Sequence, residues 1–152
     1  MKRPLTAVLL LFLLFNSFSA FSQNNNIPRP KQFGNFPNII NCSEAEISRI
    51  FSSTAGQNIN LSFSDNFSFS GNVTSNVVKY SNLQSAIIKS PVFDNTIFSI
   101  SRIINADNSI SYTGRIINLN YADGYELKKN EAGSYRLIKI ETGQVIQDCR
   151  QL

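Results

Sequence analysis

The sequence predicts an α+β fold, with one N-terminal helix packed on a curved antiparallel β-meander of about six to eight strands and closed by one disulfide. Three observations support this prediction. A capping box precedes a stretch with helical spacing, apolar residues alternate with polar ones beyond Gly56, and turn residues then recur at hairpin intervals. The chain of 152 residues is long enough for one small domain and little more.

Residues 1–22 have the pattern of a secretory signal peptide. Two basic residues precede an apolar run, residues 5–15, and small residues follow. Cleavage fits after Ala20 or after Ser22, and the second site is favoured. An uncleaved anchor is the alternative, but the apolar run is shorter than the ~20 residues that cross a membrane. We therefore expect a secreted or periplasmic, extracytoplasmic protein with no transmembrane span once the signal is removed.

Residues 23–41 predict a linker or N-terminal strap ahead of a single domain at residues 42–152. They hold three of the five prolines and a run of Asn, and they show almost no periodicity. Apolar residues gather near the end of the segment, at Phe33, Phe36, Ile39 and Ile40. A strap lying against the domain is favoured over a peptide arm offered to a partner, because free apolar residues promote aggregation.

A helix is expected to begin after Ser43. The hydroxyl of Ser43 and the carboxylate of Glu46 have the spacing of a capping box, in which each side chain accepts a backbone N–H of the other residue. Gly56 is a plausible end, which gives a helix of roughly three turns. Apolar residues of one buried face follow the cap at Ile47, Ile50 and Phe51.

Strands fill the rest of the chain. Residues 59–64 and 67–70 alternate around an Asp65-Asn66 turn and predict a hairpin that ends at Gly71. Val77, Val78 and Tyr80 suggest a third strand, and residues 86–89 fit either a strand or a helical turn. Further strands are expected at residues 96–104, 110–121, 125–128, 135–140 and 145–148. The short turns between them require antiparallel pairing.

A disulfide is expected between Cys42 and Cys149, the two cysteines of the chain. Export favours oxidation, and the bond would join the two ends of the folded region. Closing so long a loop stabilises by up to about 4–5 kcal/mol in the chain-entropy model. Free thiols and an intermolecular bridge are the alternatives.

The composition excludes several classes of site. The chain has no His, so Ser-His-Asp and Cys-His nucleophilic sites and His-rich zinc sites are excluded. The 14 Lys and Arg residues fall to 12 when Lys2 and Arg3 leave with the signal, against 10 Asp and Glu residues. A nearly neutral chain gives no reason to expect nucleic-acid binding. No motif predicts a cofactor or a metal ion.

Three functions remain for such a chain. The leading hypothesis is a small, secreted, non-enzymatic binding module that contacts a protein or an extracellular polymer through a sheet face or an edge strand, as a monomer or weak oligomer. A structural or assembly component of the cell envelope is the first alternative. The second is a small hydrolase that uses the closest acidic pair, Asp123 and Glu126. Tyr121 and Tyr125, which flank the Asp123-Gly124 turn, are the candidate partner-binding residues.

Overall fold

The computed structural model describes residues 29–146, which form an eight-stranded antiparallel sheet with two short helices. This confirms the predicted antiparallel meander. In chain order the elements are β1 Ile39–Cys42, α2 Glu44–Ile50, β2 Asn58–Ser64, β3 Phe67–Tyr80, β4 Leu83–Ser90, β5 Thr96–Ile104, β6 Ile110–Ile117, β7 Asp123–Lys129, β8 Tyr135–Glu141 and α3 Thr142–Ile146.

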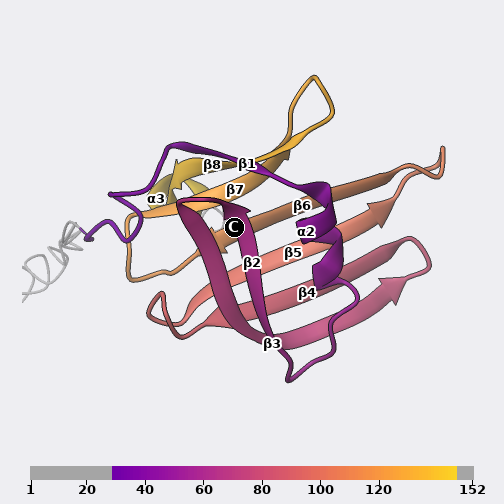
Figure 1. The fold of residues 1–152 in the computed structure, drawn as a ribbon, viewed down its shortest axis with the longest axis horizontal. Helices are drawn as coiled ribbons and strands as arrows, with labels where there is room; N and C mark the ends of the chain where they lie inside the picture. The colour runs from indigo at the N-terminus through magenta and orange to yellow at the C-terminus, as the bar shows by residue number, and fades with distance from the viewer. Residues whose placement is uncertain (1–28, 147–152) are drawn as a thin grey trace, which may run out of the picture.

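The sheet is strongly curled. Its order is β1-β8-β7-β6-β5-β4-β3-β2, so each strand from β2 to β7 pairs with the next strand of the chain, and β1 is added beside β8. Because strands twist in one direction, the sheet bends until its two edge strands, β1 and β2, contact one another. Figure 1 shows the resulting shape, which is close to a closed cylinder with a concave inner face and a convex outer face.

β3 is longer than the sequence predicts, because Gly71 does not end it. A Cβ atom at Gly71 would lie 2.7 Å from the carbonyl oxygen of Lys89 on β4, so glycine is needed where the two strands approach closely. The strand continues through Val77 and Val78 to Tyr80, and irregular register near Val73 bends it. What the sequence suggests as two strands is therefore one bent strand with two halves.

Several other segments differ from their predicted structure, among them Asp123-Gly124, which is expected as a turn but begins β7. Residues 86–89, ambiguous in the sequence, lie in β4, where neighbours on both sides pair with them. The strand predicted to reach residue 121 ends at Ile117, and a turn follows. The last predicted strand is wrong at Val145 and Ile146, which belong to α3; residues 147–148 lie outside the described part of the chain.

The helix α2 has seven residues, fewer than the three turns expected, and it lacks the capping box. The Ser43 side chain makes no capping hydrogen bond. Instead, the Glu46 carboxylate accepts the backbone N–H of Ser62 on β2 at 3.2 Å and pairs with Arg49 at 3.0 Å. Arg49 in turn donates to the carbonyl of Asn60. These two side chains therefore satisfy backbone groups on the outer edge of β2 rather than the start of their own helix.

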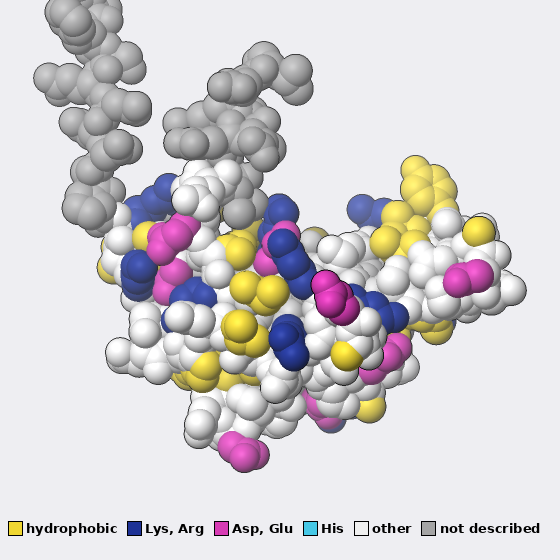
Figure 2. Space-filling model, turned by 90° about the horizontal axis from the view of Figure 1, so that it is seen from above, with side chains coloured by type: hydrophobic (Ala, Val, Ile, Leu, Met, Phe, Trp, Pro, Cys, Tyr) yellow, Lys and Arg dark blue, Asp and Glu magenta, His cyan; other side chains and the backbone are white. Residues whose placement is uncertain are grey.

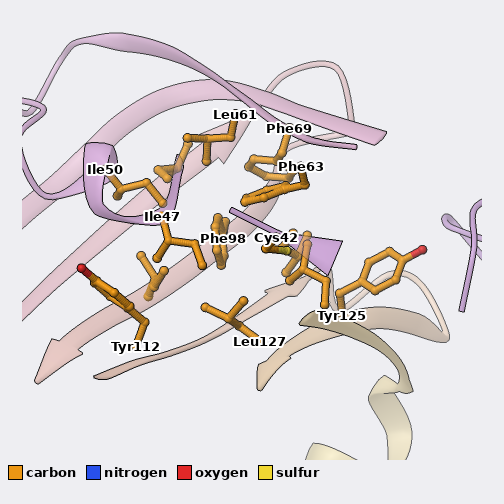
Figure 3. Packing of buried hydrophobic residues seen from close by; sticks show 14 of the residues in the cluster. Cys42, Ile47, Ile50, Leu61, Phe63, Phe69, Phe98, Tyr112, Tyr125 and Leu127 are labelled. Atoms are coloured by element: carbon orange, nitrogen blue, oxygen red, sulfur yellow. The ribbon is translucent and has the colours of Figure 1, made fainter. Parts of the chain in front are cut away.

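The hydrophobic core fills the concave face and is rich in phenylalanine. Figure 3 shows Ile47 and Ile50 of α2 at one side of the cluster and Tyr125 of β7 at the other. The ring of Phe69 meets that of Phe98 edge to face, with centroids 5.8 Å apart. The largest fully buried side chains are those of Phe33, Ile47, Ile50, Leu61, Phe67, Phe69, Ile88, Phe98, Ile100, Ile116, Tyr125 and Tyr135.

The strap, defined here as residues 29–38, contributes to this core. Phe33 is fully buried, and its ring centroid lies 5.2 Å from that of Tyr125 and 5.4 Å from that of Phe93. Ile40, which follows in β1, is also buried, whereas Ile39 is exposed. In Figure 1 the strap lies at the end of the curled sheet away from α2. The core is therefore closed by α2 at one end and by Phe33 at the other.

The Asp123 side chain of β7 holds the strap by its backbone. Asp123 is only 1% exposed, and its carboxylate accepts the N–H of Gln32 at 2.7 Å and the N–H of Phe33 at 3.1 Å. A charged acceptor strengthens such bonds. They do not depend on the side chains of the strap, and they orient Phe33 into the core.

Lys139 and Tyr125 complete this attachment. The Lys139 ammonium donates to the carbonyls of Phe33 and Phe36, at 2.8 and 2.6 Å. The Tyr125 hydroxyl donates to the carbonyl of Pro37 at 2.6 Å. A proline- and asparagine-rich segment without periodicity is thus ordered by side chains from β7 and β8.

Candidate functional site

The two tyrosines proposed as partner-binding residues do not form a common surface. Tyr125 is fully buried and its hydroxyl is used by the strap, so its assignment as a contact residue is wrong. Tyr121 is partly exposed, and its hydroxyl donates to the Asp94 carboxylate at 3.2 Å. That hydrogen bond raises the pKa of the Tyr121 hydroxyl. Tyr121 therefore links two turns of the sheet.

The proposed acidic pair is also separated. Successive residues of a strand point to opposite faces, and Asp123 and Glu126 are three residues apart, so Asp123 lies on the concave face of β7 while Glu126 lies on the convex face. Glu126 accepts from Lys128 at 2.7 Å and from Arg115 at 2.9 Å, and these bonds, that of Lys128 foremost, lower the pKa of its carboxyl group. A general acid and a general base would have to share one site. The structure instead places the two carboxylates on opposite faces of β7.

Metal-ligand clusters and membrane helices are not found among residues 29–146. No group of three or more Cys, Asp and Glu side chains in this part of the chain is placed to hold a metal ion. No helix within it is long and apolar enough to cross a membrane.

Cys42 makes no disulfide with any residue that the structure describes. Cys149 lies outside the described residues, so the bond between them stays a prediction. Cys42 is opposite Tyr135, where β8 begins, and β8 leads away from it along about 20 Å of strand.

Alkaline pH is expected to lower the free energy of unfolding of the reduced protein. Burial raises the pKa of Cys42 from 9.0 to about 11 and that of Tyr125 from 10.0 to about 12. The folded state holds both protons more tightly, so this stabilisation is complete below about pH 9 and is lost as the pH rises toward 11 and 12. Urea unfolding with reductant should show a loss of about 2–3 kcal/mol between about pH 8 and about pH 10.5.

The control for this prediction is the double variant Cys42→Ala/Tyr125→Phe. It lacks both titrating groups, so its stability should change much less over the same pH interval. An equal loss in the variant would show that other groups cause the alkaline destabilisation.

The edges of the sheet are protected in several places. Glu46 and Arg49 bond to the outer edge of β2, as described above. On β6, residues before Gly114 have no partner in β7, but the Tyr135 hydroxyl accepts the N–H of Tyr112 at 3.1 Å. Unpaired edges are sites where another strand can add, and natural sheets cover them in such ways.

One stretch of edge is not protected. β2 pairs with β3 only as far as Asn72, so residues 75–80, the second half of β3, have β4 on one side and no strand on the other. No described residue bonds to their backbone on that side. We call residues 75–80 the free edge. In an antiparallel sheet the N–H and C=O groups of alternate residues face such an unpaired side, so the free edge could take one more strand.

The free edge also exposes large apolar side chains. Val77 is 51% exposed, Val78 65% and Tyr80 68%, while Lys79 supplies the one charge of the stretch. This half of β3 and the start of β4 form an arm that projects beyond the core in Figure 1. In the space-filling view of Figure 2, an arm of the molecule carries a group of hydrophobic side chains at its outer end. Exposed apolar residues along an unpaired strand are typical of an interaction surface.

Sequence reasoning missed the free edge. Val77 and Val78 are adjacent and place apolar side chains on both faces of the strand, a pattern that is typical of a strand buried on both faces and so does not predict their exposure. The absence of a neighbouring strand depends on where β2 stops. That depends on pairing between distant residues, which the sequence does not show.

Comparisons with protein-family models, with curated proteins and with solved structures find no match to this chain.

Proposed function

We propose that this protein is an exported, non-enzymatic binding module that takes up an extended segment of a partner protein by strand addition to the free edge. The observation that carries the proposal is the unpaired backbone of residues 75–80 with its exposed Val77, Val78 and Tyr80. In strand addition, main-chain hydrogen bonds supply affinity and alternate side chains supply specificity. Export rests on the signal pattern of residues 1–22.

The surroundings of the free edge favour a partner segment that combines apolar and acidic residues. A shallow hollow of about 100 Å³ lies beside Val78 and Tyr80, and the basic side chain of Arg102 also lines it. Lys79 adds a second positive charge. An apolar side chain of the added strand would pack beside Val78 and Tyr80, and a carboxylate of that strand would pair with Lys79.

Self-assembly, as in a component of the cell envelope, is the alternative use of the same edge. Two copies could pair their free edges antiparallel, which would extend the sheet across both molecules. In that case light scattering should give a dimer that the variant described next converts to a monomer.

The variant Val78→Lys tests strand addition, since a lysine on an edge strand opposes pairing. Peptides would be selected from a random displayed library on the wild-type protein and then measured against each variant. We expect binding to Val78→Lys at least about tenfold weaker than to wild type, a difference of about 1.4 kcal/mol. Peptide binding should also slow hydrogen exchange of the amides in residues 75–80.

The matched control is Val92→Lys, which places the same charge at a valine that is 72% exposed in the β4–β5 turn. It should bind the selected peptides like the wild type. Peptides that bind Val78→Lys as tightly as wild type, or that leave exchange at the free edge unchanged, would contradict the proposal.

A further inference from the structure

The hairpin of β2 and β3 has a polar outer face made of neutral side chains. Its inner face carries Leu61, Phe63, Phe67 and Phe69, which are buried in the core. The outer face consists of cross-strand pairs of small hydroxyl and amide residues: Asn58 with Asn72, Asn60 with Ser70, and Ser62 with Ser68. Side chains directly opposite each other on a sheet interact, so these residues form one continuous ladder.

A hollow of about 740 Å³ lies against part of this ladder. Its polar lining includes Asn60, Ser62, Ser64, Asn66, Ser68 and Ser70. Phe36 of the strap, with Val92 and Phe93 of the β4–β5 turn, provides apolar lining. A volume of this size is within the range of ligand-binding clefts.

The polar lining is partly unused by the protein itself. The Ser70 hydroxyl donates to the Asn60 side chain at 2.8 Å. The hydroxyls of Ser62, Ser64 and Ser68 have no hydrogen-bond partner among the described residues, and all three residues are exposed. Each hydroxyl can donate one hydrogen bond and accept two, so the hollow offers donors and acceptors together.

The charge of the lining limits what can bind. Asp65 is the one charged residue in it, so an anionic ligand would find no counter-charge, and a divalent cation would find too few carboxylates. An entirely apolar ligand would bury the serine hydroxyls without partners. A neutral ligand with many hydroxyl groups meets both requirements, because its hydroxyls bond to the ladder and its C–H surfaces pack on the rings of Phe36 and Phe93.

We propose that this hollow binds a neutral saccharide chain. The site lies on the first half of β3 and on β2, whereas the free edge is the second half of β3. The two sites share no residue, so the saccharide site goes beyond the proposed protein-binding function. Together they would let one small domain join an extracellular polysaccharide to a protein.

The test uses NMR of the 15N-labelled protein with neutral hexasaccharides of the cello, chito, malto and manno series at millimolar concentration. At least one series should shift the amides of residues 58–70 saturably. Oligogalacturonate is the anionic probe and should cause no such shift. The variant Ser62→Ala/Ser68→Ala removes two exposed hydroxyls and should weaken binding at least about tenfold.

The control is Ser99→Ala, which removes an exposed hydroxyl from β5 outside the hollow and should leave saccharide binding unchanged. The proposal is overturned if no neutral series shifts residues 58–70, if Ser62→Ala/Ser68→Ala binds like wild type, or if oligogalacturonate binds the hollow equally well. Amide spectra of both variants establish that they are folded. Val78→Lys changes only the free edge and should bind saccharides like the wild type. Loss of saccharide binding at the hollow and loss of peptide binding at the free edge are therefore measured independently.

Discussion

Replacement of Phe33 by alanine is expected to lower the free energy of unfolding by about 3–5 kcal/mol, the usual cost of removing a fully buried phenylalanine ring. Phe33 is completely buried among the rings of Phe67, Phe93 and Tyr125. The strap has limited freedom to fill the cavity left behind, because Asp123 and Lys139 hold the backbone at Phe33. Urea unfolding followed by circular dichroism measures the change.

The matched control is Phe36→Ala, in the same strap. Phe36 packs against Phe33 at 6.1 Å between centroids but remains partly exposed, so its replacement should cost less than half as much. Equal losses for the two variants, or a small loss for Phe33→Ala, would mean that the strap is not part of the cooperative core.

Replacement of Asp123 by alanine is expected to lower the free energy of unfolding by about 2–4 kcal/mol, because buried donors that lose their acceptor pay a desolvation penalty. The backbone N–H groups of Gln32 and Phe33 are the donors concerned. Hydrogen exchange supplies a second readout. In Asp123→Ala these two amides should exchange faster than in the wild type, and the increase in rate should be larger than that of the amides of β5.

Glu126→Ala on the same strand is the control for Asp123→Ala. Glu126 bonds to Arg115 and Lys128 on the outer face, and such surface pairs contribute about 1 kcal/mol or less. If Asp123→Ala destabilised no more than Glu126→Ala, or if the strap amides kept their protection, the carboxylate would not be what holds the strap.

Strand positions were largely predictable because alternation and turn chemistry are local. Asp65-Asn66 lies in the turn between β2 and β3, and the segment at residues 96–104 agrees with β5 at both ends. Errors arose where a residue serves a distant partner. Gly71 suggested a strand end, yet it permits the contact with Lys89, and Glu46 suggested a helix cap, yet it bonds to Ser62.

The candidate sites were harder to predict than the strands. Tyr125 and Asp123 have the residue types of contact and catalytic groups, but both face the core and hold the strap. The free edge exists because β2 pairs with β3 only as far as Asn72. The hollow exists because the strap and the β4–β5 turn lie beside the hairpin of β2 and β3. Neither property is encoded within a short stretch of sequence.

The antiparallel meander and the polar and apolar faces of most strands can be predicted from the amino-acid pattern, because a period of two residues and short turns act over neighbouring residues. Three features are visible only in the folded chain: the sheet curls until β1 meets β2, Phe33 belongs to the core, and residues 75–80 stay unpaired on one side. These features depend on contacts between residues far apart in the chain. Such contacts form when the sheet twists and buries its aromatic face, and they leave no periodic pattern in the sequence.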